Sequence, residues 1–180
     1  MKENFYELSP VIEGIILKEK PRSVLEISGY NEKYGRLISD CQKRAHTGTA
    51  HIGDLKVDRI SLIDKEFYET SKVYTKVYLS DVLGSLSDIE KYDIIVIFHL
   101  LENMYNEDAK VLLEALLEKT KNQILVITPQ YPYDLSADSL ISDVQTYYPE
   151  FFHDINFNHK MLNSSEGVWQ GYCFFPDPIE

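Results

Sequence analysis

The stretch "SVLEISGYNEKYGRL" (residues 23–37) holds residue types, in an order, from which a cofactor-binding turn can be built. A short apolar strand, Val24 to Ile27, runs into a turn that contains Gly29, and a helical pattern follows. A nucleotide-type cofactor site begins in this way in α/β proteins, because the turn and the helix start bring backbone N–H groups close to the ligand. The stretch therefore predicts a turn that lies against a cofactor.

His99 is the second feature that could do chemistry, because it directly follows the apolar run "DIIVIF" (93–98). An imidazole titrates near neutral pH and can take a proton from a reacting group. The same residue type is also common as a half-buried histidine bonded to a backbone carbonyl, and the sequence leaves both interpretations open. His46 and His51 share a loop without a third ligand at a suitable spacing, so we expect no metal site.

Strands and helices that would position these residues alternate along the chain. Apolar runs predict buried strands, and apolar residues recurring at three- and four-residue intervals predict helices on their faces. The expected strands are 24–27, 59–64, 76–79, 93–101 and 123–128; the expected helices start at Ser9–Pro10, near Tyr34, at a cap on Asn106 and near Leu140, the last ending before Pro149.

The C-terminal part has a different pattern. Two strand-like runs, 151–162 and 168–175, flank "NSSEG", which is typical of a hairpin loop. Alternating strands and helices require a parallel sheet with right-handed crossovers. We therefore expect an α/β fold with a doubly wound, mostly parallel seven-stranded sheet, a C-terminal antiparallel hairpin and helices on both faces.

The length of 180 residues indicates one domain. We expect an N-terminal helix in residues 1–22, a cofactor-binding half in 23–128, and a helix with the hairpin in 129–180. The start of the chain lacks the apolar core of a secretory signal, and no run is long enough to span a membrane. Two widely separated cysteines, Cys41 and Cys173, suit reduced thiols in a cytoplasmic protein.

Charge narrows the class of partner. The net charge is −11, and residues 130–180 carry eight carboxylates against one lysine. Such a surface repels phosphate backbones, so we expect a small molecule, a glycan or a protein as partner and no nucleic acid or membrane. The aromatic residues of the tail exceed what one hairpin face buries easily, and they predict a homodimer contact there.

The order of these motifs resembles the class I S-adenosylmethionine-dependent methyltransferases, from about Ser23 to Phe175. "VLEISGYNEKYG" looks like the first motif of that family, a strand ending in an acid, a glycine turn and a helix start. "SLID", "YLSDVL", "YDIIVIFHLLENM" and "LVITPQYP" look like the ends of strands two to five. The resemblance implies the Rossmann-like methyltransferase fold and S-adenosylmethionine as cofactor.

The resemblance also implies roles for individual residues. Glu26 takes the place of the first-motif acid, with Ser28 and Gly29 in the turn. Asp64 stands where the family binds the ribose hydroxyls, and Asp81 with Val82 stands near the adenine position. A carboxylate suits these roles because it accepts two hydrogen bonds at once. His99 and Glu102 would lie near the transferred methyl group, as the catalytic residues.

Two functions remain open at this point. One is methyl transfer to a small molecule or a glycan. The other is a degenerate, non-catalytic methyltransferase fold that serves as a binding or assembly subunit, because Ser28, Tyr30 and Glu32 fall where the family has glycines. A nicotinamide dehydrogenase is disfavoured because no G-x-G-x-x-G is present.

Overall fold

The computed structural model describes residues 9–28, 33–48, 52–61, 73–79, 81–129, 159–163 and 169–176. In chain order the elements are α1 (Ser9–Glu19), β1 (Ser23–Ser28), α2 (Lys33–Ala45), the 3-10 turn η1 (Ile52–Asp54), β2 (Lys56–Ser61), β3 (Lys76–Leu79), α3 (Val82–Ser85), β4 (Tyr92–Phe98), the 3-10 turn η3 (Leu101–Asn103), α4 (Asn106–Lys119), β5 (Thr120–Pro129), β6 (His159–Asn163) and β7 (Trp169–Phe174).

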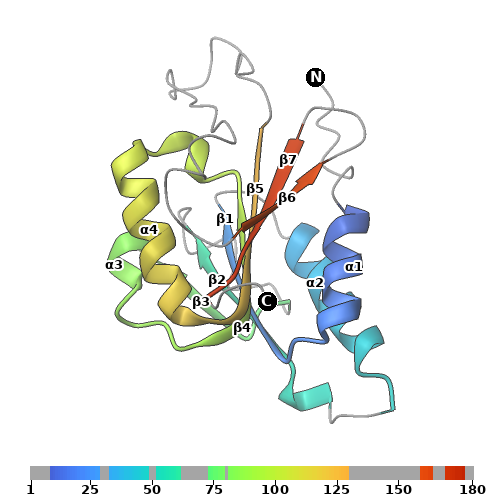
Figure 1. Cartoon of the computed structure of the whole chain (residues 1–180). Helices are drawn as coiled ribbons and strands as arrows, with labels where there is room; N and C mark the ends of the chain where they lie inside the picture. The colour runs from blue at the N-terminus through green and yellow to red at the C-terminus, as the bar shows by residue number, and fades with distance from the viewer. Residues whose placement is uncertain are drawn as a thin grey trace.

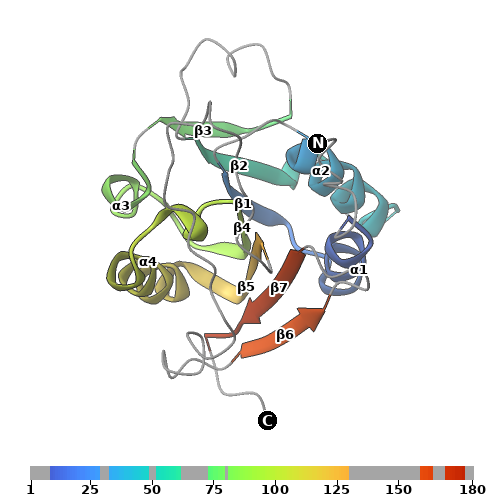
Figure 2. The same cartoon turned by 90° about the horizontal axis from the view of Figure 1, so that it is seen from above.

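The described strands form one seven-stranded sheet in the order β3-β2-β1-β4-β5-β7-β6 (Figure 2). Strands β1 to β5 pair in parallel, whereas β7 is antiparallel to both β5 and β6. The expected fold class is thereby confirmed: a mostly parallel sheet closed by an antiparallel hairpin.

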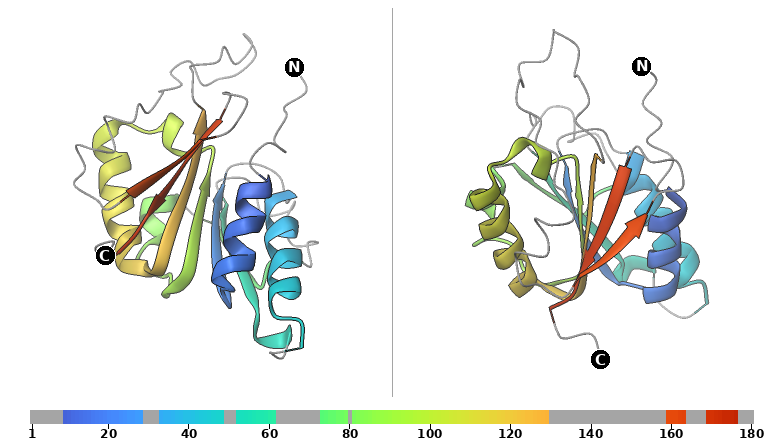
Figure 3. Two further views of the ribbon diagram at one scale, coloured as in Figure 1. Left: turned by 45° about the vertical axis from the view of Figure 1, so that its right-hand side comes forward. Right: turned by 45° about the horizontal axis from the view of Figure 1, so that its top comes forward.

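Helices cover both faces of the sheet, with α1 and α2 on one side and α3 and α4 on the other (Figures 1 and 3). The side chains of β1 contribute to the core on both faces of the sheet, because successive side chains of a strand point to opposite faces. Val24 packs on the α1–α2 side, and Leu25 and Ile27 pack on the α3–α4 side. Both faces are buried, which explains the nearly continuous apolar sequence of these strands.

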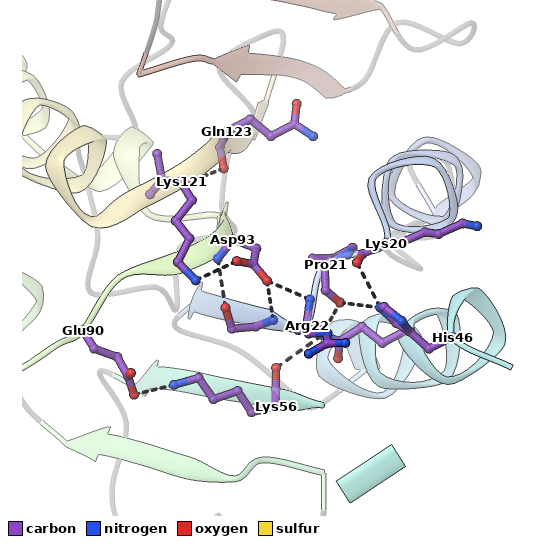
Figure 4. Close-up of polar contacts among 12 residues, drawn as sticks. Lys20, Pro21, Arg22, His46, Lys56, Glu90, Asp93, Lys121 and Gln123 are labelled. Atoms are coloured by element: carbon purple, nitrogen blue, oxygen red, sulfur yellow. Dashed lines mark hydrogen bonds and ion pairs between the residues drawn. The ribbon is translucent and has the colours of Figure 1, made fainter. Parts of the chain in front are cut away.

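Hydrogen bonds and ion pairs fasten the amino ends of the strands (Figure 4). Asp93 Oδ2 accepts the backbone N–H groups of Arg22 at 2.8 Å and Ser23 at 3.0 Å, and Oδ1 lies 2.8 Å from Lys121 Nζ. Burial raises the pKa of Asp93, but the hydrogen bonds from these groups outweigh it and hold that pKa below its ordinary value. His46 Nε2 lies 2.9 Å from the Lys20 carbonyl oxygen at the same edge.

Some boundaries differ from expectation. Strand β2 begins at Lys56, three residues before its predicted start. The predicted cap on Asn106 is wrong, because Tyr105 is the N-cap of α4 and makes no side-chain capping hydrogen bond. The run predicted as a strand to residue 101 ends at Phe98, because the next residue adopts φ +51° and turns the chain into η3.

Parts of the C-terminal prediction lie outside the described residues, namely the helix near Leu140 and the run 151–158. Tyr172 and Phe174 of β7 are fully buried in the core of the chain itself. These two rings therefore add nothing to an exposed aromatic surface, and the homodimer contact stays a prediction. None of the helices within the described ranges has the length and apolar character needed to cross a bilayer.

Candidate functional site

The candidate site lies where β1 and β4 end side by side. Ser28 and Phe98 are register partners at the carboxyl ends of these parallel strands. The strand order reverses here, since β2 and β3 follow on one side of β1 and β4 and β5 on the other. Ligands of open α/β sheets bind outside the carboxyl ends of the strands at such a switch point.

Glu26, the expected first-motif acid, is completely buried on the α1–α2 side of β1. Its Oε1 accepts a hydrogen bond from Ser28 Oγ at 2.8 Å, and its Oε2 accepts one from the Tyr74 hydroxyl at 2.9 Å. Arg59 Nη1 lies 3.9 Å from Oε1. Protein groups therefore surround this carboxylate, and none of it is exposed to solvent.

Arg59 is also completely buried, and it connects the partners of Glu26. Its Nη1 donates to the Tyr74 hydroxyl at 3.0 Å, and its Nη2 donates to the Ser28 carbonyl at 3.4 Å. Burial and the neighbouring Glu26 carboxylate raise the pKa of Tyr74, so the phenol keeps its proton. The phenol can thus donate to Glu26 while it accepts from Arg59.

The sequence interpretation missed Arg59 and Tyr74, although Arg59 carries a detectable pattern. "VLEIS" (24–28) and "VDRIS" (57–61) have the same form, with opposite charges at the third position. In the sheet these segments are paired residue by residue, and Glu26 is the register partner of Arg59. Opposite charges at matched positions of neighbouring buried strands predict an internal ion pair, because an unpaired buried charge is costly. Tyr74 gives no comparable pattern.

His99 and Glu102, the two expected catalytic residues, lie in contact just after the carboxyl end of β4. Both side chains are buried, and His99 Nδ1 lies 3.3 Å from Glu102 Oε1. If Nδ1–H donates to the carboxylate, the basic lone pair of the imidazole resides on Nε2. His99 also adopts a left-handed backbone with φ +51°, a conformation that costs free energy in residues other than glycine; Lys20, at the amino ends of the strands, is a second example.

Two polar atoms at this edge lack hydrogen-bond partners among the described residues. They are Glu102 Oε2, in η3 after β4, and Thr128 Oγ1, near the end of β5, and both are buried. Buried polar atoms are nearly always paired. A ligand with hydrogen-bonding groups that reached this edge would therefore supply what the described part of the chain does not.

Asp81 and Val82 follow β3 and have local structural partners. Asp81 is exposed and caps α3, with Oδ1 accepting the Gly84 N–H at 2.6 Å. Val82 packs into the core on the α3–α4 side. Gly29 and Asp64, the other expected cofactor residues, lie outside the described residues, as do Tyr30 and Glu32. The structure thus joins Glu26 to Ser28 and His99 to Glu102.

Comparison with known proteins gives structural neighbours only. No protein-family model matches the sequence, and no curated protein matches it. Among solved structures, an O-methyltransferase family protein from Burkholderia thailandensis matches with a TM-score of 0.64 at 11% identity, over 94% of this chain and 55% of that protein. Human N-acetylserotonin methyltransferase, solved with S-adenosylmethionine, matches with a TM-score of 0.63 at 10% identity, over 93% and 51%.

A third neighbour is similar in size to this chain. The methyltransferase domain of bacterial CtHen1-CN matches with a TM-score of 0.63 at 12% identity, over 94% of this chain and 97% of that domain. The chain spans about half the length of the first two proteins and nearly all of this domain. These likenesses show that the chain has the class I methyltransferase fold.

Proposed function

We propose that the chain is an S-adenosylmethionine-dependent methyltransferase that acts on a hydroxyl group of a small molecule or a glycan. The buried His99–Glu102 pair at the carboxyl end of β4 carries this proposal, because the fold places cofactor chemistry at that edge. The neighbour named as an O-methyltransferase family protein supports an oxygen acceptor, and human N-acetylserotonin methyltransferase supports methyl transfer more generally.

The cofactor fits the described residues at one end of the site better than at the other. The buried Glu102 Oε2 and Thr128 Oγ1 suit a ligand with hydrogen-bonding groups at the ends of β4 and β5. Asp81 offers an exposed carboxylate after β3, where the resemblance puts the adenosyl group, together with Val82, Gly29 and Asp64. Glu26 does not fit a direct role, because its carboxylate is enclosed. Bound S-adenosylmethionine supplies a methyl group on a sulfonium leaving group.

The chain's own contribution to the reaction would be to position the acceptor and remove its proton. His99 takes the hydroxyl proton of the acceptor on Nε2 while Glu102 holds Nδ1–H. The buried carboxylate also stabilises the imidazolium that results. This arrangement suits an oxygen acceptor, since a hydroxyl must lose its proton as the methyl group is transferred.

One observation favours the second function, a non-catalytic methyltransferase fold. The Glu26 carboxylate is buried and has protein partners on both oxygens, so this acid serves the interior of the protein. A chain that had lost the cofactor would keep the architecture and the ion pair with Arg59, and it would act through a surface.

Calorimetric titration with S-adenosylmethionine and S-adenosylhomocysteine separates the two functions. The methyltransferase proposal predicts binding of both at micromolar to low millimolar concentration, and adenosine alone, without the amino-acid part, should bind more weakly. A radiolabelled methyl group should then reach an acceptor in a panel of phenols, alcohols and glycans. Absence of binding at millimolar concentration would leave the non-catalytic function.

A further inference from the structure

Tyr74 connects the start of α2 to the interior of the sheet. A Cβ atom at Gly35, in the first turn of α2, would lie 2.4 Å from the Tyr74 hydroxyl oxygen. Glycine at this position therefore makes room for the phenol, which passes against the helix and reaches Glu26. Tyr74 can pack this closely against α2 because residue 35 is a glycine.

The same turn of α2 is held by a second contact. The Tyr34 ring stacks on Phe98, with ring centroids 3.9 Å apart and an interplanar angle of 9°. Phe98 is the last residue of β4 and is completely buried. The start of α2 thus packs against β4 through Tyr34 and against the Tyr74 side chain, whose hydroxyl is hydrogen-bonded to Glu26 of β1.

Arg59 contacts the end of β1, where the chain leaves the strand toward α2. Its guanidinium donates to the Ser28 carbonyl and to the Tyr74 hydroxyl, so one side chain touches both groups. The chain leaves β1 at Ser28 and enters α2 at Lys33. The β1 flank of the predicted cofactor turn is therefore hydrogen-bonded to this buried network, and the α2 flank packs against its Tyr74 side chain at Gly35.

From these contacts we infer that Tyr74 and Arg59 are positioning residues for the cofactor, acting through Glu26 on the flanks of the β1–α2 turn. This inference rests on the proposed function. It gives Glu26, the first-motif acid, an indirect role. Its carboxylate holds Ser28 and Tyr74 in place and does not itself contact the cofactor.

Tyr74→Phe is the most selective variant, because it keeps the ring and removes the hydroxyl that joins Glu26 to Arg59. Tyr78→Phe is the matched control. It also removes a buried tyrosine hydroxyl, one that lies 3.4 Å from the Tyr92 hydroxyl on the opposite face of the sheet. Two quantities are measured for each variant: the affinity for S-adenosylhomocysteine, and the amide hydrogen exchange of Leu37 and Ile38.

Those two amides report directly on the first turn of α2. In an α-helix their N–H groups donate to the carbonyls of Lys33 and Tyr34. Tyr74→Phe should speed their exchange and weaken S-adenosylhomocysteine binding by about 10- to 100-fold each, the size expected for a lost hydrogen bond to a charged group. Tyr78→Phe should leave both unchanged at temperatures well below its unfolding transition.

The affinity and the amide exchange test separate parts of the inference. If the wild type binds no S-adenosylhomocysteine, the proposed function fails, and exchange alone decides whether the network holds α2. If Tyr74→Phe speeds exchange but leaves affinity unchanged, the network is only structural and the positioning role is overturned. Unchanged exchange at Leu37 and Ile38 would overturn the inference altogether. Because Tyr74→Phe and Tyr78→Phe remove the same group, a general loss of stability would affect both variants alike.

Discussion

Polar side chains at the amino ends of the strands (the amino edge of the sheet) bind different partners from those at the carboxyl ends (the carboxyl edge). At the amino edge, Asp93 binds two backbone N–H groups and a lysine, and His46 binds a backbone carbonyl (Figure 4). At the carboxyl edge, two buried carboxylates, Glu26 and Glu102, pair with Arg59 and His99.

The contacts at the amino edge serve mainly the stability of the fold. Groups at the amino edge bond the backbone of neighbouring elements, so their loss should loosen the fold. The amino edge also holds a left-handed residue, Lys20, and a buried oxygen, Asp58 Oδ1 beside Tyr92, that lacks a partner among the described residues. What distinguishes the carboxyl edge is that its left-handed residue is a histidine paired with a buried carboxylate, a combination that can do acid–base chemistry.

The largest expected effect is on catalysis at His99. Asparagine at this position tolerates the left-handed backbone but cannot accept the proton. His99→Asn should lower kcat about 10²- to 10⁴-fold, the range for a lost general base, and should destabilise the fold by about 1–3 kcal/mol, because the buried Glu102 carboxylate loses its partner. Methyl transfer assays and urea unfolding measure the two effects. Full activity in this variant would exclude His99 as the base.

Removing the cation from each edge compares the two ion pairs. Arg59→Met leaves a completely buried Glu26 without its counter-charge and should destabilise the fold by about 3–5 kcal/mol. Lys121→Met removes a half-exposed partner of Asp93 and should cost about 0.2–1 kcal/mol. Urea unfolding of both variants gives the comparison, and equal costs would show that burial does not distinguish the pairs.

Asp93 itself should matter more than its lysine, because it also satisfies two backbone N–H groups. Asp93→Ala should cost about 1.5–3 kcal/mol and leave cofactor binding unchanged. The folded pKa of Asp93 is lowered, so its contribution is fully present above the unfolded value of about 4 and is lost as the pH falls through the folded value. Unfolding measured against pH for the wild type and Asp93→Asn should converge in acid; a constant gap would contradict this account.

Asp81 has the smallest expected effect on cofactor binding, and two variants separate that effect from its capping of α3. Asp81→Ala removes the α3 cap and should cost about 0.5–2 kcal/mol. Asp81→Asn keeps a good capping side chain but removes the charge, so stability should persist while S-adenosylhomocysteine binds a few-fold more weakly. Thermal unfolding and calorimetry of both variants check this. Unchanged affinity in Asp81→Asn would limit Asp81 to capping.

The sequence predicted the fold far better than the site. Apolar strands and helical periodicity reflect burial, which the sheet imposes on every element, so the seven strands were found and β4 was misjudged only where His99 turns the chain. The pairing of His99 with Glu102 was also within reach, since both lie in one short segment. The partners of Glu26 come from distant segments, and only the matched "VLEIS" and "VDRIS" patterns indicate one of them, Arg59.

Amide chemical-shift mapping with S-adenosylhomocysteine tests the division between the two edges most directly. The account predicts that binding shifts the amides of Ser28, Val82 and His99, at the carboxyl ends of the strands. It also predicts that the amides of Arg22 and Asp93, at the amino edge, do not move. Shifts confined to the amino edge, or none anywhere at millimolar ligand, would contradict the claim that the carboxyl edge is a cofactor site.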